Sequence, residues 1–220
     1  MRDKGKNWEE LVNDGEQYGG PSHNYSQNQK TVIESIRDKA ILKIQDKYVF
    51  SKTGASLGEN HGRELAGLLA HFEPLKAITS LIITHNDLGV EGIRLLAEST
   101  VFNCVNYLHL GSNNLGDEGV KILSRAEVFS NVRTLNLECN KITAEGARAL
   151  ADSPVFVNLT SLNLVDNRIG NEGALFIADS DALSNLTYLH LGGNRVKSEE
   201  AQGSLRKSKK LARLQTLKIF

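Results

Sequence analysis

The residue types of this chain that could carry chemistry are a cysteine, two histidines and a carboxylate. Cys139 stands 27 residues before Asp166, and a thiol, an imidazole and a carboxylate together can form a nucleophilic centre. His109 and His190 stand in two nearly identical phrases, "YLHLGSN" and "YLHLGGN", and two histidines can begin a metal site. Either centre requires that these side chains meet in space, so the elements that carry them decide the question.

A repeat of 27 residues carries all four side chains. The segments "ITSLIITHNDL", "VNYLHLGSNNL", "VRTLNLECNKI", "LTSLNLVDNRI" and "LTYLHLGGNRV" follow the pattern LxxLxLxxNxL with conservative apolar changes. The asparagine of the pattern recurs at a constant spacing, at Asn86, Asn113, Asn140, Asn167 and Asn194. Five matches in one register predict a repeat architecture.

Each unit predicts one strand followed by one helix. In "YLHLG" the apolar residues alternate with others, so Leu108 and Leu110 face the interior while Tyr107 and His109 point away from it. In "GVKIL" the apolar residues lie three and four apart, which is typical of one face of a helix. A single unit cannot bury its apolar face, so stacked units must share one core. The stack predicts a parallel sheet on the concave side and helices on the convex side.

The repeated pattern resembles the leucine-rich-repeat family. The phrase E-G-x-x-x-(L/I), as in "LGVEGIRLLAES" and "LGDEGVKILSRA", resembles the ribonuclease-inhibitor-like type. The resemblance covers residues 57–220 and implies an α/β leucine-rich-repeat solenoid, or horseshoe, of about six repeats with the last one incomplete. The short, regular copies are also similar to those in effector proteins of intracellular bacterial pathogens, which implies host or co-injected protein partners.

The repeated asparagines predict a structural ladder rather than a binding site. Each strand ends at its asparagine, where the turn leaves backbone groups without sheet partners. A buried amide side chain can donate and accept hydrogen bonds at once, so stacked copies of Asn86 to Asn194 are expected to serve these groups.

The outward residues of successive strands are expected to form columns on the concave face. Tyr107 and Tyr188 lie three strands apart, or about 15 Å at the usual strand spacing. Two Tyr–His pairs therefore bracket a lower polar surface, an arrangement that suits a protein interface; the alternative is ordinary exposure to solvent. The residues predicted to bind a partner are Tyr107, His109, Asn136, Glu138, Asn163, Asp166, Arg168, Tyr188, His190 and Arg195.

The same geometry argues against both chemical centres. His109 precedes the strand position equivalent to Cys139 by three residues, an offset of about 10 Å that excludes a hydrogen bond. The two histidines lie about 15 Å apart, too far to share a metal ion. The sequence also contains no HExxH, GxSxG or Walker-type motif. We therefore predict a chain that is not an enzyme and has no cofactor and no metal.

The regions before the repeats are interpreted as a tail and a cap. Residues 1–27 are polar and rich in Gly, Asn and Gln, which is typical of a flexible tail. Residues 28–56 predict a helical N-terminal cap over the first repeat, or alternatively a partner-binding helix. The stripe that favours a helix is Val32, Ile33, Ile36, Ala40 and Ile44. At the other end the chain stops at Phe220 within an expected strand, so we expect truncation or a covered sheet edge there.

The charge and hydropathy patterns limit the partners and the location. The chain has 26 basic and 26 acidic residues, and this balance disfavours nucleic acid as a partner. No apolar run approaches the roughly 18 residues of a membrane span, and the N-terminus lacks a secretory signal. We expect no membrane partner, and a location in the cytoplasm or secretion into a host cytoplasm without a cleaved signal.

These features predict a non-catalytic protein-binding module, monomeric on its own, whose concave sheet grips a folded protein. The resemblance to ribonuclease-inhibitor-like proteins implies that the module inhibits or regulates an enzyme by occluding its active site. The alternative is an adaptor, in which the repeats hold a substrate and the N-terminal helix recruits other machinery such as a ubiquitin ligase.

Overall fold

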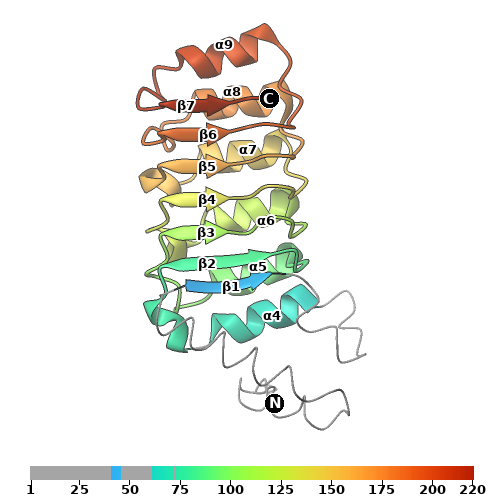
Figure 1. The fold of residues 1–220 in the computed structure, drawn as a ribbon, viewed down its shortest axis with the longest axis vertical. Coiled ribbons are helices and arrows are strands. Elements are labelled where there is room, and N and C mark those ends of the chain that lie inside the picture. The colour runs from blue at the N-terminus through green and yellow to red at the C-terminus, as the bar shows by residue number, and fades with distance from the viewer. Residues whose placement is uncertain (1–40, 46–60, 72) are drawn as a thin grey trace.

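The repeats form one parallel sheet with helices behind it (Figure 1). The computed structural model describes residues 41–45, 61–71 and 73–220. Within these residues the sheet has seven parallel strands in chain order. The strands are β1 (Ile41–Gln45), β2 (Ser80–Thr84), β3 (Tyr107–His109), β4 (Thr134–Asn136), β5 (Ser161–Asn163), β6 (Tyr188–His190) and β7 (Thr216–Lys218).

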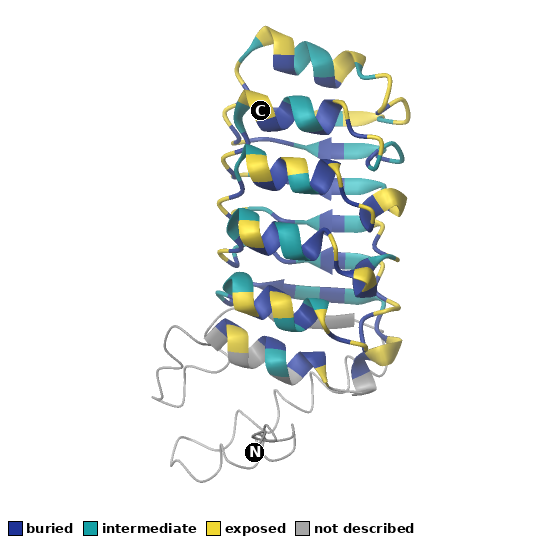
Figure 2. Cartoon of the chain, turned by 180° about the vertical axis from the view of Figure 1, so that it is seen from behind, coloured by how far each residue is buried: buried dark blue, intermediate teal, exposed yellow. Residues whose placement is uncertain are grey.

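The helices lie on one side of this sheet and are stacked in the same order (Figures 1 and 2). They are α4 (His61–Ala70), α5 (Gly89–Ala97), α6 (Gly116–Leu123), α7 (Ala144–Ala151), α8 (Gly170–Ala178) and α9 (Glu199–Lys207). Short 3-10 turns, η2 (Glu73–Ala77), η3 (Glu127–Phe129) and η4 (Phe156–Asn158), lead back toward the sheet. The α-helices are amphipathic. In α6, for example, Val120 and Leu123 are buried while Glu118 is exposed.

The strand register follows the sequence period. Leu108 pairs with Leu135, and Leu135 with Leu162, so residues 27 positions apart become direct neighbours. The solenoid fold expected from the repeats is therefore confirmed. Because side chains alternate along a strand, the buried leucines of β2 to β6 line the core and their neighbours face outward.

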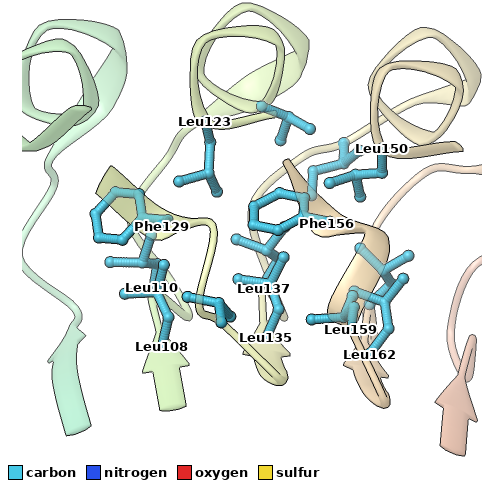
Figure 3. Close-up of a cluster of buried hydrophobic side chains, with 14 of the residues drawn as sticks. Leu108, Leu110, Leu123, Phe129, Leu135, Leu137, Leu150, Phe156, Leu159 and Leu162 are labelled. Carbon is cyan, nitrogen blue, oxygen red and sulfur yellow. The ribbon is translucent and has the colours of Figure 1, made fainter. Parts of the chain in front are cut away.

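The core between sheet and helices contains a row of phenylalanines that the sequence analysis did not anticipate. Phe102, Phe129 and Phe156 recur every 27 residues and have no exposed surface. The rings of Phe102 and Phe129 are stacked with their centroids 6.1 Å apart. Figure 3 shows Phe129 and Phe156 between the leucines of the helices and those of the strands. Phe129 and Phe156 belong to the 3-10 turns η3 and η4, which precede β4 and β5.

The repeated asparagines form a hydrogen-bonded ladder at the ends of the strands. The backbone N–H groups of Asn86, Asn113 and Asn140 each donate to the side-chain oxygen of the next asparagine, at 2.9 to 3.0 Å. The side-chain amides donate in turn to backbone carbonyls, as Asn140 does to Leu110 at 2.9 Å. The side-chain oxygens of Asn140, Asn167 and Asn194 also accept from the N–H groups of Leu115, Ile142 and Ile169 in the repeat before them.

A second polar row, of serines, follows the helices. Ser153 donates from its hydroxyl to the carbonyl of Ser124 in the previous repeat, at 2.7 Å, and accepts from the N–H of Val155. Ser99, Ser180 and Ser208 make equivalent bonds to the preceding repeat. These serines satisfy carbonyls at helix C-termini, which otherwise lack partners.

Neighbouring helices are joined in two different ways. The carboxylate of Asp117 accepts from the N–H groups of Thr143 and Gly146, at 2.8 and 3.0 Å, and so caps α7 from the repeat before it. Asn171 instead holds the residue that precedes α9, by accepting from the N–H of the N-cap residue Ser198 at 3.0 Å. Helices α7 and α8 instead pack closely, since a Cβ at Gly173 would lie 3.0 Å from the Cβ of Ala147.

The prediction of a helical N-terminal cap is wrong at Ile41–Gln45, because these residues form strand β1 rather than part of a helix. The remaining positions of that expected cap, 28–40 and 46–56, and the expected tail, 1–27, lie outside the described residues. The spacing of Ile41 and Ile44 fits a helix, but a short apolar run fits a strand as well. Pairing with β2 supplies sheet hydrogen bonds to "ILKIQ", and it places Leu42 in register with Leu81.

Candidate protein-binding face

We call the outward-facing residues of β2–β7 the sheet face. On β3, β4, β5 and β6 a buried leucine stands between two partly exposed residues, so each strand offers two side chains to solvent. The strand register aligns these residues in two columns. The columns read Ser80, Tyr107, Thr134, Ser161, Tyr188, Thr216 and Ile82, His109, Asn136, Asn163, His190, Lys218.

The glycines of the two related phrases make room for the histidines. A Cβ at Gly111 would lie 2.9 Å from Nε2 of His109, and a Cβ at Gly192 would lie 3.0 Å from Nε2 of His190. Each imidazole therefore folds toward the glycine two residues later, just beyond the end of its strand. The recurrence of Gly with His in "YLHLG" is the signal in the sequence that could have revealed this arrangement.

The two histidines nevertheless meet different neighbours. His109 lies 3.5 Å from the carboxylate of Glu138 on the adjacent repeat. Asn163 and Asn136 also donate to Glu138, at 2.9 and 3.3 Å. The centre of the sheet face is therefore a polar network that joins His109, Asn136, Glu138 and Asn163, four of the residues predicted to bind a partner.

The second Tyr–His pair, Tyr188 and His190, lies next to Lys218 of strand β7. The Tyr188 hydroxyl lies 3.4 Å from Nδ1 of His190, and the Nζ of Lys218 lies 5.7 Å from the centre of the Tyr188 ring. Partial burial, and then the charge of Lys218, lower the pKa of His190 below its usual value. His190 therefore stays neutral at neutral pH and can donate or accept a hydrogen bond. The role of Lys218 was missed, because it depends on the contact with the Tyr188 ring.

Three of the predicted residues lie apart from this network. Asp166, Arg168 and Arg195 are exposed and follow the ends of β5 and β6. Asp166 and Arg195 have positive φ angles, of 53° and 60°, in the turn that surrounds the buried asparagine. We call the exposed residues that directly follow the asparagine ladder the rim.

Comparison with known proteins agrees with this geometry. The protein family described as Leucine Rich repeat matches five successive segments, at residues 77–97, 103–124, 130–151, 157–178 and 182–199. The chain belongs to the leucine-rich-repeat family. This membership indicates a protein-binding module. A search of curated proteins finds no match.

Two solved structures show a distant similarity to the chain. The C-terminal domain of tropomodulin from Caenorhabditis elegans is 22% identical, with a TM-score of 0.42, over 60% of this chain and 81% of that domain. An internalin from Listeria monocytogenes is 18% identical, with a TM-score of 0.30, over 70% of this chain and 49% of the internalin.

The leucine-rich repeats place Cys139 in surroundings that do not activate it. Loss of water around the sulfur, and then the charge of Asp166, raise the pKa of Cys139, while a hydrogen bond with Ser112 lowers it by less. A nucleophilic cysteine requires the opposite shift, because the thiolate is the reactive form. Among the described repeats, no group of three or more His, Cys, Asp or Glu side chains could hold a metal ion. No helix in the same residues has the length and apolar composition to cross a membrane.

We expect Cys139 to react with iodoacetamide at pH 7.5 a few-fold more slowly than a thiol in a short unstructured peptide. The raised pKa leaves less thiolate at that pH, and Asp166→Asn should speed the reaction by removing a nearby negative charge. Mass spectrometry of digested protein measures the rate, with exposed Cys104 as an internal reference. A Cys139 that reacts faster than the peptide would contradict this and favour a nucleophilic role.

Proposed function

We propose that the sheet face binds a folded protein and that, when the partner is an enzyme, the bound repeats occlude its active site. One observation carries this proposal. Two Tyr–His pairs stand three strands apart on a face whose intervening positions are the small polar residues Thr134, Ser161, Asn136 and Asn163.

The spacing and chemistry of this face suit a protein surface. Three strand steps separate Tyr107 from Tyr188 by about 15 Å, which is too wide for one small ligand to touch both. Tyrosine is enriched among residues that dominate binding energy at interfaces. A stable interface covers about 800 Å² on each partner, so a partner protein would extend across the strands of the sheet face and onto the loops beside it.

The helical backs of the repeats support the ribonuclease-inhibitor-like type. Every 27-residue unit from α5 to α8 carries an α-helix of 8 or 9 residues opposite its strand. That type is the reason for preferring occlusion of an enzyme to simple tethering. The expected measurement is loss of the partner enzyme's activity in proportion to 1:1 binding.

Tyr188→Ala should weaken binding of the partner by at least about 2 kcal/mol, because Tyr188 is buttressed by His190 and Lys218. The partner is first identified by cross-linking in lysate, and its affinity for purified variants is then measured by calorimetry. Phe176→Ala is the matched control, since it removes a partly buried aromatic ring from helix α8 on the opposite side. A loss below about 0.5 kcal/mol for Tyr188→Ala, with unchanged thermal unfolding, would move the interface elsewhere.

The adaptor alternative is separated by a deletion whose boundary the fold defines. Because β1 belongs to the sheet, the deletion should remove residues 1–40 and keep the strand. An inhibitor keeps its binding and its inhibition after this deletion. An adaptor keeps its binding but loses the output that depends on recruited machinery.

A further inference from the structure

Two rows of basic residues repeat every 27 positions, one on the helices and one after the ends of the strands. The helix row consists of Arg94, Lys121 and Arg148 in α5, α6 and α7. The rim row consists of Lys141, Arg168 and Arg195, each one residue after an asparagine of the ladder. Both rows hold three cations on three successive repeats, so they can be compared directly.

Each cation of the helix row forms an ion pair with a carboxylate three or four residues away in sequence. Arg94 pairs with Glu91 at 3.4 Å, Lys121 with Glu118 at 2.7 Å, and Arg148 with Asp152 at 3.6 Å. The pairs are three or four residues apart, the spacing at which side chains meet on a helix surface. These cations therefore have carboxylate partners within the molecule.

The rim row has no such partners among the described residues. Lys141, Arg168 and Arg195 are exposed, and none of them forms an ion pair within that part of the chain. The nearest carboxylate in sequence, Asp166, is exposed two residues before Arg168 but lies beyond ion-pair distance of it. The row therefore keeps a concentrated positive charge over the ends of β4, β5 and β6.

We propose that the rim row docks an acidic helix of the protein partner. The three cations follow neighbouring strands, so they are spaced by about 4.8 Å and span about 10 Å. Carboxylates at positions i, i+3 and i+7 of an α-helix are spaced along its axis by about 4.5 and 10.5 Å. Alternate residues of an extended segment are about 6.8 and 13.6 Å apart, so a helix matches the row more closely.

This inference rests on the proposed function, since the rim borders the sheet face and one partner would cover both. The sheet face supplies the aromatic anchors Tyr107 and Tyr188, and the rim supplies charge. Exposed ion pairs add little affinity but steer association and select the orientation of the partner. The acidic helix would thus fix which way the partner lies across the repeats.

The test uses the full chain and a synthetic alanine-based helix of roughly 18 residues with glutamates at i, i+3 and i+7. NMR titration at low salt detects binding with a dissociation constant on the order of 1 mM. We expect shifts of the backbone amides of residues 139–141, 166–168 and 193–195. An isomer of equal composition with glutamates at i, i+2 and i+5 presents them on different faces and should bind several-fold more weakly. Equal binding of the two peptides would overturn the helix assignment.

Matched triple variants separate the rim from the net charge. Lys141→Gln, Arg168→Gln and Arg195→Gln together should weaken peptide binding about tenfold. Arg94→Gln, Lys121→Gln and Arg148→Gln together remove the same charge from the helix row and should change it less than about twofold. Asp166→Asn should instead strengthen peptide binding, because it removes a negative charge beside Arg168 that repels the glutamates of the peptide. Equal effects of the two triple variants would overturn the proposal.

Tyr188→Ala distinguishes this proposal from the one on which it rests. The substitution should weaken binding of the protein partner at least about 30-fold and leave binding of the acidic peptide unchanged. If Tyr188→Ala loses the partner while the rim variant still binds the peptide normally, the sheet face is the interface and the rim proposal alone is wrong.

Discussion

Phe129→Ala should lower the free energy of unfolding by about 4 kcal/mol. Phe129 has no exposed surface and stacks on Phe102, with the rings inclined by only 14°. It lies between Leu123 of helix α6 and Leu110 beside strand β3 (Figure 3). Removal of the ring leaves a cavity that the rigid strand and helix on either side cannot close.

Urea unfolding followed by circular dichroism measures this loss. Phe176→Ala removes the same atoms from a partly exposed position on α8 and should cost less than about half as much. Phe129→Leu keeps most of the volume and should fall between the two. A cost for Phe129→Ala no larger than that of Phe176→Ala would show that the phenylalanine row does not hold the repeats together.

Asn140→Ala should lower the free energy of unfolding by about 3 kcal/mol. The side-chain oxygen of Asn140 accepts from the N–H groups of Asn113 and Leu115, and its amide donates to the carbonyl of Leu110. All of these groups are buried. Alanine cannot replace these bonds, and water has no access to the site, so several backbone groups lose their partners together.

The control is Asn131→Ala, which removes an exposed asparagine with one hydrogen bond, to the carbonyl of Asn103. Its expected cost is below about 0.5 kcal/mol. Because repeat proteins can unfold in parts, both variants should be followed by hydrogen exchange at the flanking repeats as well as by urea. Similar costs for the two variants would contradict a structural ladder.

The repeat period made much of the fold predictable from the sequence. A constant step of 27 residues forces the leucines, the asparagines and the outward residues into register, and Tyr107 and Thr134 do lie side by side on β3 and β4. No detailed side-chain packing is needed for this step, because every repeat imposes the same geometry on its neighbour.

The features of the fold and of the sheet face that the sequence did not predict depend on contacts that the 27-residue period does not specify. Ile41–Gln45 pair with β2 although Leu42 lies 39 residues before Leu81, so they fall outside the 27-residue step. The two "YLHLG" phrases have the same local geometry but different neighbours, Glu138 for His109 and Lys218 for His190. Sequence identity between repeats predicts the position of a side chain but not the residue across from it.

The hydrogen bonds that Asp117 and Asn171 make to the next helix have a direction. Each reaches from an earlier repeat to the N-cap residue of a later helix, Thr143 of α7 or Ser198 of α9. A nascent chain leaving the ribosome presents Asp117 before Thr143, so the later helix meets an acceptor that is already in place. Synthesis from the N-terminus therefore matches the order in which these two helices can be completed.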